Sequence, residues 1–153
     1  MNIEKLLTVT EVEISYKSKI KPSERPKISG SVGCSEIFRA IHEFNKNIEY
    51  KEMFYVMFLN RNNKVLSVQK IAEGTTSACL VDVKMIMQGA ILQNASSLIL
   101  CHNHPSGNLR ASTEDINVTR KIKEGAKLFD IAVLDHIILT DESYISLADE
   151  GQI

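Results

Sequence analysis

The alternation of apolar and polar residues divides the chain into short strands and amphipathic helices. Short apolar runs bounded by turn residues are typical of buried strands. We expect strands over residues 6–16, 52–59, 64–72, 97–101, 131–139 and 144–147. Because short polar turns separate the second strand from the third and the fifth from the sixth, each of these pairs is expected to form a hairpin.

Three segments have apolar residues at the three- and four-residue spacing of a helix. The first spans residues 34–47, with Ser31 or Ser35 as its N-cap, and the others follow the expected N-caps Asp82 and Ser112. Their inward-facing residues are expected to be Ile37, Phe38, Ile41 and Phe44, then Val83, Ile86, Met87, Ala90 and Ile91, then Ile116, Thr119, Ile122 and Ala126. Helices interleaved with strands predict a mixed sheet with helices packed on it, an α/β or α+β sandwich.

Residues 17–30 fit neither pattern. They include Pro22 and Pro26, and five basic residues against one glutamate, which predicts an extended connector across the surface.

Composition indicates an ordinary soluble protein of about one domain. The 153 residues are 44% hydrophobic and 24% charged, and the net charge of −1 gives no overall attraction to nucleic acid or to an anionic membrane. The three cysteines are odd in number and lack a C-x-x-C pattern, which argues against a disulfide framework. No secretory or membrane-spanning run is present, so we expect a cytoplasmic protein without membrane contact.

Two histidines stand one residue apart where the apolar run 97–101 gives way to proline and glycine. In an extended segment, His102 and His104 point to the same side, so both rings can address one point. Asp115 follows in the first turn of the last expected helix. Two histidines and one carboxylate can hold zinc and leave a coordination position for water, as in hydrolytic sites.

Hydrolysis of an amide also needs a proton acceptor and a donor for the developing oxyanion. Ser112, three residues before Asp115, suits the donor's task, because capping uses its oxygen and leaves its hydroxyl proton free. A purely structural interpretation remains, with Ser112 as an N-cap and Asp115 as a first-turn acid. For the proton acceptor, the residues alone leave Glu49, Glu52 and Glu73 open.

The order Glu, His-x-His-Pro, Ser-x-x-Asp resembles the JAMM motif of the JAB/MPN metallopeptidase domain. The longer His-Asn-His-Pro-Ser-Gly run, with Gly74-Thr75 upstream and Leu134-Asp135-His136 downstream, is similar to the RadC-like bacterial branch. The likeness spans about residues 48–151, so we divide the chain into an N-terminal extension, 1–47, packed on a JAB/MPN domain, 48–153. We expect no helix-hairpin-helix module like that of longer members, because roughly fifty residues precede Glu52.

The resemblance implies a layered fold like that of cytidine deaminases and one zinc ion held by His102, His104 and Asp115. It also implies Ser112 as the oxyanion donor. Its glutamate begins an apolar strand, and Glu52-Met53-Phe54 fits that place, so Glu52 is the expected general base. A zinc deaminase is disfavoured, because its H-x-E and P-C-x-x-C signatures are missing.

Neighbouring residues receive smaller roles. His136 is expected to support the ligands from a buried strand, since a fourth protein ligand would close the site to water. Ser106 and Asn103 are expected to line the loop and contact substrate, with Ser106 also near the ligands. Cys101 should point to the opposite face as a small buried residue.

We therefore expect a zinc-dependent hydrolase of amide or isopeptide bonds, acting on an unidentified peptide or protein. The alternative is an accessory protein of DNA repair or of mobile elements with a structural or silent metal site. Nucleic-acid binding is not supported by the charge, and the sequence sets no oligomeric state.

Overall fold

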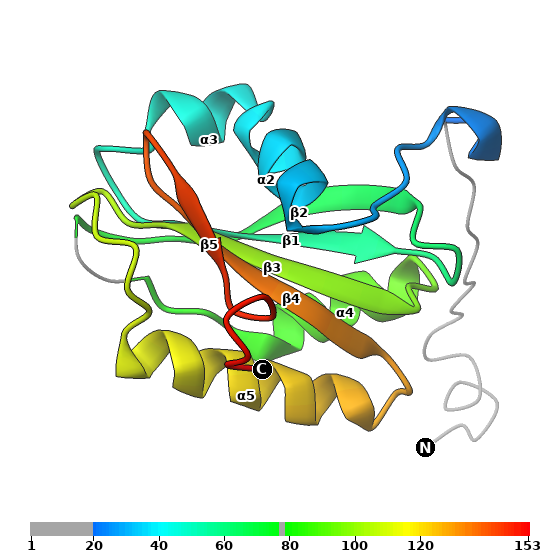
Figure 1. Cartoon of the computed structure of the whole chain (residues 1–153). Helices are drawn as coiled ribbons and strands as arrows, with labels where there is room; N and C mark the ends of the chain where they lie inside the picture. The colour runs from blue at the N-terminus through cyan, green and yellow to red at the C-terminus, as the bar shows by residue number, and fades with distance from the viewer. Residues whose placement is uncertain (1–19, 77–78) are drawn as a thin grey trace, which may run out of the picture.

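A mixed sheet of five strands, in the order β2-β1-β3-β4-β5, has helices on both faces (Figure 1) in the computed structural model, which describes residues 20–76 and 79–153. Only the β3–β4 pair is parallel; the other neighbours are antiparallel. The strands are β1 (Met53–Leu59), β2 (Val65–Glu73), β3 (Ser97–Asn103), β4 (Ala132–Leu139) and β5 (Tyr144–Ser146). The helices are α2 (Ser31–Arg39), α3 (His42–Lys46), α4 (Val83–Leu92) and α5 (Thr113–Lys127), preceded by a short 3-10 turn, η1 (Pro22–Glu24). The expected α/β sandwich and both hairpins are confirmed.

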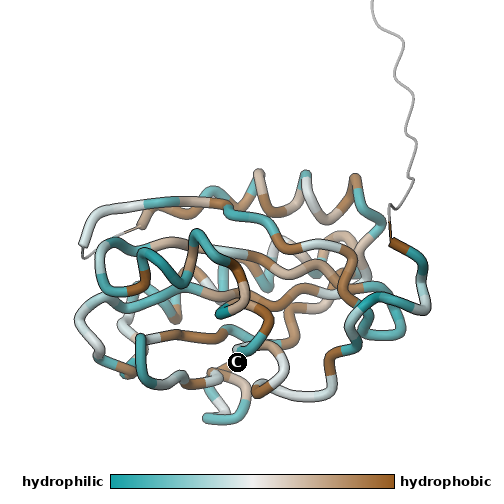
Figure 2. The backbone as a smooth tube through the Cα atoms, turned by 90° about the horizontal axis from the view of Figure 1, so that it is seen from above, coloured by the Kyte–Doolittle hydropathy of each residue, from teal (hydrophilic) through white to brown (hydrophobic). Residues whose placement is uncertain are grey.

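The central strands β1 and β3 are buried along their whole length, so their alternate residues supply two separate cores. Even-numbered residues such as Phe58 and Leu100 join the core under α4 and α5. Odd-numbered residues such as Met57 and Ile99 join the core under α2 and α3. Figure 2 shows the apolar colouring along these central segments. The position of a residue along either strand therefore decides which helical layer its side chain faces.

Helices α4 and α5 begin where the sequence predicted. The side chain of Asp82 accepts a hydrogen bond from the Lys84 backbone N–H, which caps α4. On α4, Ile86 and Ala90 are fully buried, but Ile91 is 48% exposed, so its expected inward position is wrong. Of the helices in the described residues, none combines the length and the apolar composition needed to cross a bilayer.

The single helix expected over residues 34–47 is instead two helices. The first ends at Arg39, and Ile41, in an extended conformation, is the N-cap of α3. This break lets both Phe38 and Phe44 reach the core under α2 and α3, where each is fully buried.

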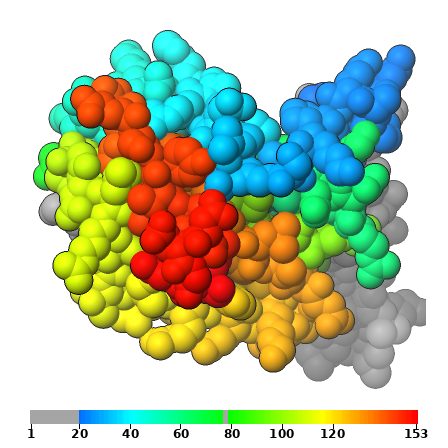
Figure 3. Space-filling model, in the orientation of Figure 1, coloured from blue at the N-terminus to red at the C-terminus, as the bar shows by residue number. Residues whose placement is uncertain are grey.

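The expected caps of the first helix are also wrong, because Gly30 occupies the N-cap position without a side-chain bond. Ser31 Oγ donates to Asp149 Oδ2 at 2.6 Å and lies 3.3 Å from the Tyr144 hydroxyl. Ser35 Oγ donates to the Val32 carbonyl at 2.8 Å. The C-terminal residues, red in Figure 3, thus lie against α2.

The N-terminal expectations are only partly within the described residues. The strand expected over 6–16 lies outside them, and the division at residue 47 stays a prediction. The described part of the connector contains η1 and then runs beside β2, where the Val65 N–H donates to the Pro26 carbonyl at 2.9 Å.

Asn103 ties the last residue of β3 to the chain that leads into β1. Its side chain is fully buried on the α2 and α3 side. Its Oδ1 accepts from the Met53 N–H at 2.8 Å, and its Nδ2 donates to the carbonyls of Ile48 at 2.7 Å and Lys51 at 2.8 Å. These bonds fix the backbone on either side of Glu52. Substrate contact by Asn103, as expected from the sequence, is therefore wrong, because its side chain turns into the opposite core.

Replacing Asn103 by alanine should destabilise the protein by about 3 kcal/mol, because buried backbone groups lose their partners. Chemical denaturation measures this free energy of unfolding. The control is Asn45→Ala on α3, whose side chain is exposed and whose removal should cost less than about 0.5 kcal/mol. Equal effects of the two substitutions would contradict the structural role of Asn103.

Candidate metal centre

His102 and His104 leave the end of β3 on the face covered by α5. His102 continues the even-numbered positions of the strand, and the His104 N–H donates to the Leu139 carbonyl at 2.9 Å, which extends the pairing with β4. Gly107 then turns the chain with a φ of +77°, a conformation that favours glycine. Cys101 faces the other core and is fully buried, and burial raises its pKa well above the usual value, as expected for a structural cysteine.

A capping box holds Asp115 at the start of α5. Ser112 Oγ accepts from the Asp115 N–H at 3.0 Å. In return, Asp115 Oδ2 accepts from the Ser112 N–H and from its hydroxyl, each at 2.7 Å. The expectation that the hydroxyl proton of Ser112 is free is therefore wrong in this structure, because the hydroxyl donates a hydrogen bond to the Asp115 carboxylate.

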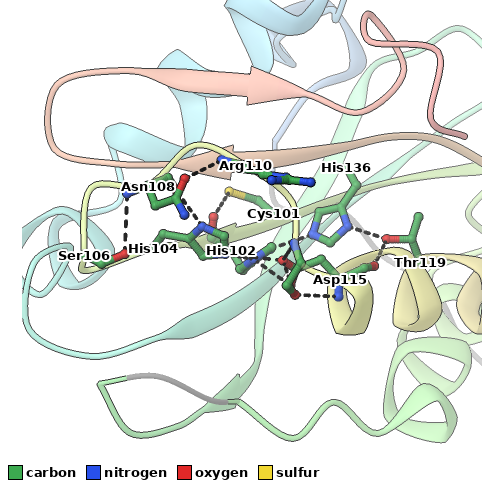
Figure 4. Close-up of polar contacts among 10 residues, drawn as sticks. Cys101, His102, His104, Ser106, Asn108, Arg110, Asp115, Thr119 and His136 are labelled. Carbon is green, nitrogen blue, oxygen red and sulfur yellow. Dashed lines mark hydrogen bonds and ion pairs between the residues drawn. The ribbon is translucent and has the colours of Figure 1, made fainter.

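The structure brings His102, His104 and Asp115 together into a group that can hold a metal ion (Figure 4). His102 Nε2 lies 2.9 Å from His104 Nε2 and 3.0 Å from Asp115 Oδ1. His104 Nε2 lies 3.4 Å from Asp115 Oδ2. Ligand atoms about 2.0 Å from a tetrahedral zinc ion lie roughly 3.3 Å from one another, so these nitrogen–nitrogen and nitrogen–oxygen distances are near the required spacing.

The other ring nitrogen of each histidine also has a partner. His104 Nδ1 lies 2.6 Å from the Asn108 carbonyl, which can only accept, so Nδ1 carries a proton and, in the neutral ring, Nε2 has the free lone pair. His102 Nδ1 lies 2.8 Å from His136 Nε2. His136 thus lies beside the ligands, where the sequence placed it, and contacts His102 through a ring nitrogen.

Electrostatics within the group favour charge separation. Burial by itself would raise the pKa of Asp115, but His102 and His104, which can donate to it when their rings are protonated, and the hydrogen bond from Ser112 hold it well below the usual range. Burial by itself would lower the pKa of His104, but the Asp115 carboxylate and the Asn108 carbonyl raise it. An ionised carboxylate beside two imidazoles is a set of ligands suited to a divalent cation.

Of the three glutamates left open by the sequence, Glu52 lies beside the group. It precedes Phe54, whose Cα pairs with that of His102, so by alternation Glu52 faces the same side as the histidines. Burial raises the pKa of Glu52, and the neighbouring His102 and His104 offset only part of this effect.

The other two glutamates lie elsewhere. Glu73 pairs with Met53 across the sheet and so faces the α2 and α3 side, where its carboxylate binds Lys51 and Lys70. Glu49 is exposed in the turn before β1.

A cleft of about 580 Å³ opens at this group between α5 and the segment that follows β2. One part of its wall carries Glu52, the two histidines, Ser112 and Asp115. Phe54, Cys79, Leu80, Val81 and Val118 line an apolar part, and Glu114, Asn117 and Lys121 line the rest. Ser106 is not among the lining residues; its hydroxyl accepts from the Asn108 N–H at 3.4 Å and so supports the loop behind His104.

Sequence reasoning gave no site role to Phe54 or Thr119. Phe54 stacks on the His102 ring, with centroids 6.1 Å apart and planes at 12°. Thr119 Oγ1 lies 2.6 Å from His136 Nδ1. Both residues sit at expected core positions, and only their alignment with the histidines, which depends on the fold, distinguishes them from ordinary core residues.

The fold and the site define a class of protein, a layered α/β domain with a candidate metal centre in a cleft. Comparison with known families makes this specific, because residues 33–152 match the family described as the RadC-like JAB domain. The chain belongs to this family, as the resemblance in its sequence implied.

Relatives named UPF0758 proteins are similar over much of the chain. The protein of Clostridium acetobutylicum is 39% identical over 147 residues, which cover 95% of this chain and 62% of that protein. The protein of Flavobacterium johnsoniae is 43% identical over 100 residues, 65% of this chain and 44% of that protein. The protein of Clostridium botulinum is 34% identical over 148 residues, 97% of this chain and 63% of that protein. The chain thus matches about half to two thirds of the length of these curated relatives.

The raised pKa of Glu52 predicts a stabilising substitution at the site. Because the folded state holds the Glu52 proton more tightly than the unfolded chain does, this residue's contribution to stability falls as the pH rises above about 4. Glu52→Gln removes that loss, so the metal-free variant should become more stable than the metal-free parent protein as the pH rises to neutrality. Denaturation at several pH values with a chelator present measures this difference.

The control is Glu73→Gln, because its hydrogen bonds with Lys51 and Lys70 lower the pKa of Glu73. A lowered pKa contributes stability above the unfolded value, and that contribution is lost as the pH falls. At neutral pH, Glu73→Gln should therefore lower the stability of the protein, whereas Glu52→Gln should raise it. Loss of stability at neutral pH in Glu52→Gln would contradict the environment described for Glu52.

Proposed function

We propose that this chain is a zinc-dependent hydrolase of peptide or isopeptide amide bonds. The observation that carries the proposal is the convergence of His102 Nε2, His104 Nε2 and an Asp115 carboxylate oxygen in a cleft that Glu52 also lines. Membership of the RadC-like JAB family supports it, because this domain is related to metallopeptidases by its motif.

The set of donors favours zinc over harder cations. Two imidazole nitrogens and one carboxylate oxygen suit zinc, whereas magnesium and calcium prefer oxygen ligands throughout. Three protein ligands also leave a coordination position open, as hydrolytic zinc sites require. A zinc ion bound there would lower the pKa of water and polarise the carbonyl of the scissile bond.

Glu52 is the proposed proton carrier. Its carboxylate would accept a proton from the attacking water and return it to the leaving nitrogen, which must depart as a neutral amine. A carboxyl whose pKa is raised by burial is suited to both transfers, because its two protonation states lie closer in free energy at neutral pH.

Ser112 is the proposed oxyanion donor. Its hydroxyl proton, which now goes to Asp115 Oδ2, would turn to the developing oxyanion in the cleft. The Ser112 N–H would still donate to that carboxylate oxygen, so Asp115 would keep its orientation during this change.

The cleft favours a substrate with an apolar side chain close to the scissile bond. Leu80 is 93% exposed at the cleft, beside the partly buried Val81 and Val118 and the buried Phe54. Binding is favoured when an apolar group of the substrate covers such a surface, because apolar area is removed from water. We therefore propose a peptide or protein substrate with an apolar residue next to the bond that is cut.

Metal analysis of three proteins tests the hydrolase proposal. The parent chain should bind one zinc ion per molecule and hydrolyse amide substrates. Asp115→Asn should lose tight zinc binding, and Glu52→Gln should keep the zinc while losing at least about a hundredfold in kcat. Less than stoichiometric zinc in the parent chain, or equal zinc affinity in Asp115→Asn, would overturn the proposal.

Hydroxamates, which chelate zinc without being hydrolysed, test the apolar preference by binding alone. N-acetyl-leucine hydroxamate should bind roughly tenfold more tightly than N-acetyl-glycine hydroxamate, because its side chain covers the apolar wall. Leu80→Ser should reduce this ratio. Leu128→Ser, at a comparably exposed leucine that does not line the cleft, should leave it unchanged. Equal affinities for the two compounds in the parent chain would contradict the preference.

A further inference from the structure

We infer that Thr119 and His136 are positioning residues that fix the ring of His102 in the tautomer with its proton on Nδ1. The inference rests on the proposed metal site, because that tautomer leaves the His102 Nε2 lone pair facing the other ligands. The three residues belong to different elements, with His102 on β3, Thr119 on α5 and His136 on β4. Figure 4 shows the His136 ring between the other two side chains.

The direction of the hydrogen bonds is set at Thr119. Its Oγ1 lies 2.6 Å from the Asp115 backbone carbonyl, which can only accept, so the hydroxyl proton goes to that carbonyl. Oγ1 must therefore act as the acceptor in its contact with His136 Nδ1, also at 2.6 Å. The ring proton of His136 accordingly lies on Nδ1.

The protonation of His136 determines which nitrogen of His102 carries the proton. It is fully buried, and its ring nitrogens contact Thr119 Oγ1 and His102 Nδ1, so a charged ring would have no carboxylate in contact among the described residues. A neutral ring with its proton on Nδ1 presents Nε2 as an acceptor, so His102 Nδ1 must be the donor across the 2.8 Å contact.

The consequence for the ligands is a matched pair of imidazoles. The Asn108 carbonyl fixes the proton of His104 on Nδ1, and the Thr119–His136 relay does the same for His102. Both rings then present Nε2 lone pairs to the Asp115 carboxylate and to each other. The two lone pairs, 2.9 Å apart, would repel without a cation or a proton between them.

The relay also joins two of the ligand residues. Thr119 follows Asp115 by one helical turn. Its Oγ1 accepts the hydrogen bond from His136 Nδ1 and donates its own proton to the Asp115 carbonyl. The His102 ring and the first turn of α5 are therefore connected by side chains as well as through the metal. Because His136 is a neutral acceptor, it orients His102 without adding negative charge to a buried site, as a carboxylate in this position would.

Long-range ¹H–¹⁵N NMR of the imidazole rings tests the inference without catalysis. In the metal-free parent chain, at a pH where His102 is neutral, both His102 and His136 should carry the proton on Nδ1. Thr119→Ser keeps the hydroxyl and should keep both tautomers. Thr119→Val, of similar shape, removes the acceptor, so a substantial fraction of His136 should move its proton to Nε2.

Zinc affinity, measured by competition with a chelator, is the second readout. Thr119→Val should bind zinc roughly tenfold more weakly than Thr119→Ser, which should match the parent chain. An Nε2–H tautomer of His102 or His136 in the parent chain would overturn the inference, and so would equal zinc affinity in the Val and Ser variants. Nδ1–H tautomers in a parent chain that binds no zinc would instead overturn the proposed function and leave the hydrogen-bond relay intact.

Discussion

The antiparallel register that places Phe54 on β1 opposite His102 on β3 is the constraint on which the site depends. It sets the even-numbered residues of both strands toward α5, so Glu52 and both histidines face one cleft. A slip of one residue would turn either set to the opposite face. The side chain of Asn103 lies in the opposite core. Its hydrogen bonds to the chain around Glu52 stabilise this end of the β1–β3 pairing.

The second requirement is that α5 begins at a fixed place. The capping box between Ser112 and Asp115 stabilises the helix, and it also fixes the carboxylate that completes the ligand group. The same bonds thus serve the fold and the site. Glu52 is different, because its burial favours the protonated form and the neighbouring His102 and His104 offset only part of this effect. Such a cost is typical of a residue kept for chemistry.

Local sequence was sufficient for much of this arrangement. The apolar run before His102, the one-residue spacing to His104 and the helix start at Ser112 predicted the ligand group, because each depends on neighbours in the chain. Glu52 needed the family motif, since only the pairing of β1 with β3 places it beside His102, and only the pairing of β1 with β2 turns Glu73 to the other face. Asn103 was expected to line the loop, but it is the last residue of β3, where strand alternation turns its side chain away from His102.

The family motif pointed to His136, but the pattern of the strand alone could not predict its face or its hydrogen-bond partners. The pairing of β3 with β4 shifts register between Leu98 and Ile99, so Val133 and His136 face the same core although one is odd and the other even. Leu134 is left 40% exposed at this irregularity. No periodic pattern in the sequence reports such a bulge, and so the face of His136 follows only from the folded sheet.

X-ray absorption at the zinc edge of the loaded protein tests the central claim most directly. Two imidazoles, one carboxylate and one further light atom should surround the metal, with all bonds near 2.0–2.1 Å and the multiple scattering typical of imidazole. The cleft also contains Cys79, so the method distinguishes this site from one that uses sulfur. A zinc–sulfur distance near 2.3 Å, or a shell without imidazole, would contradict the account.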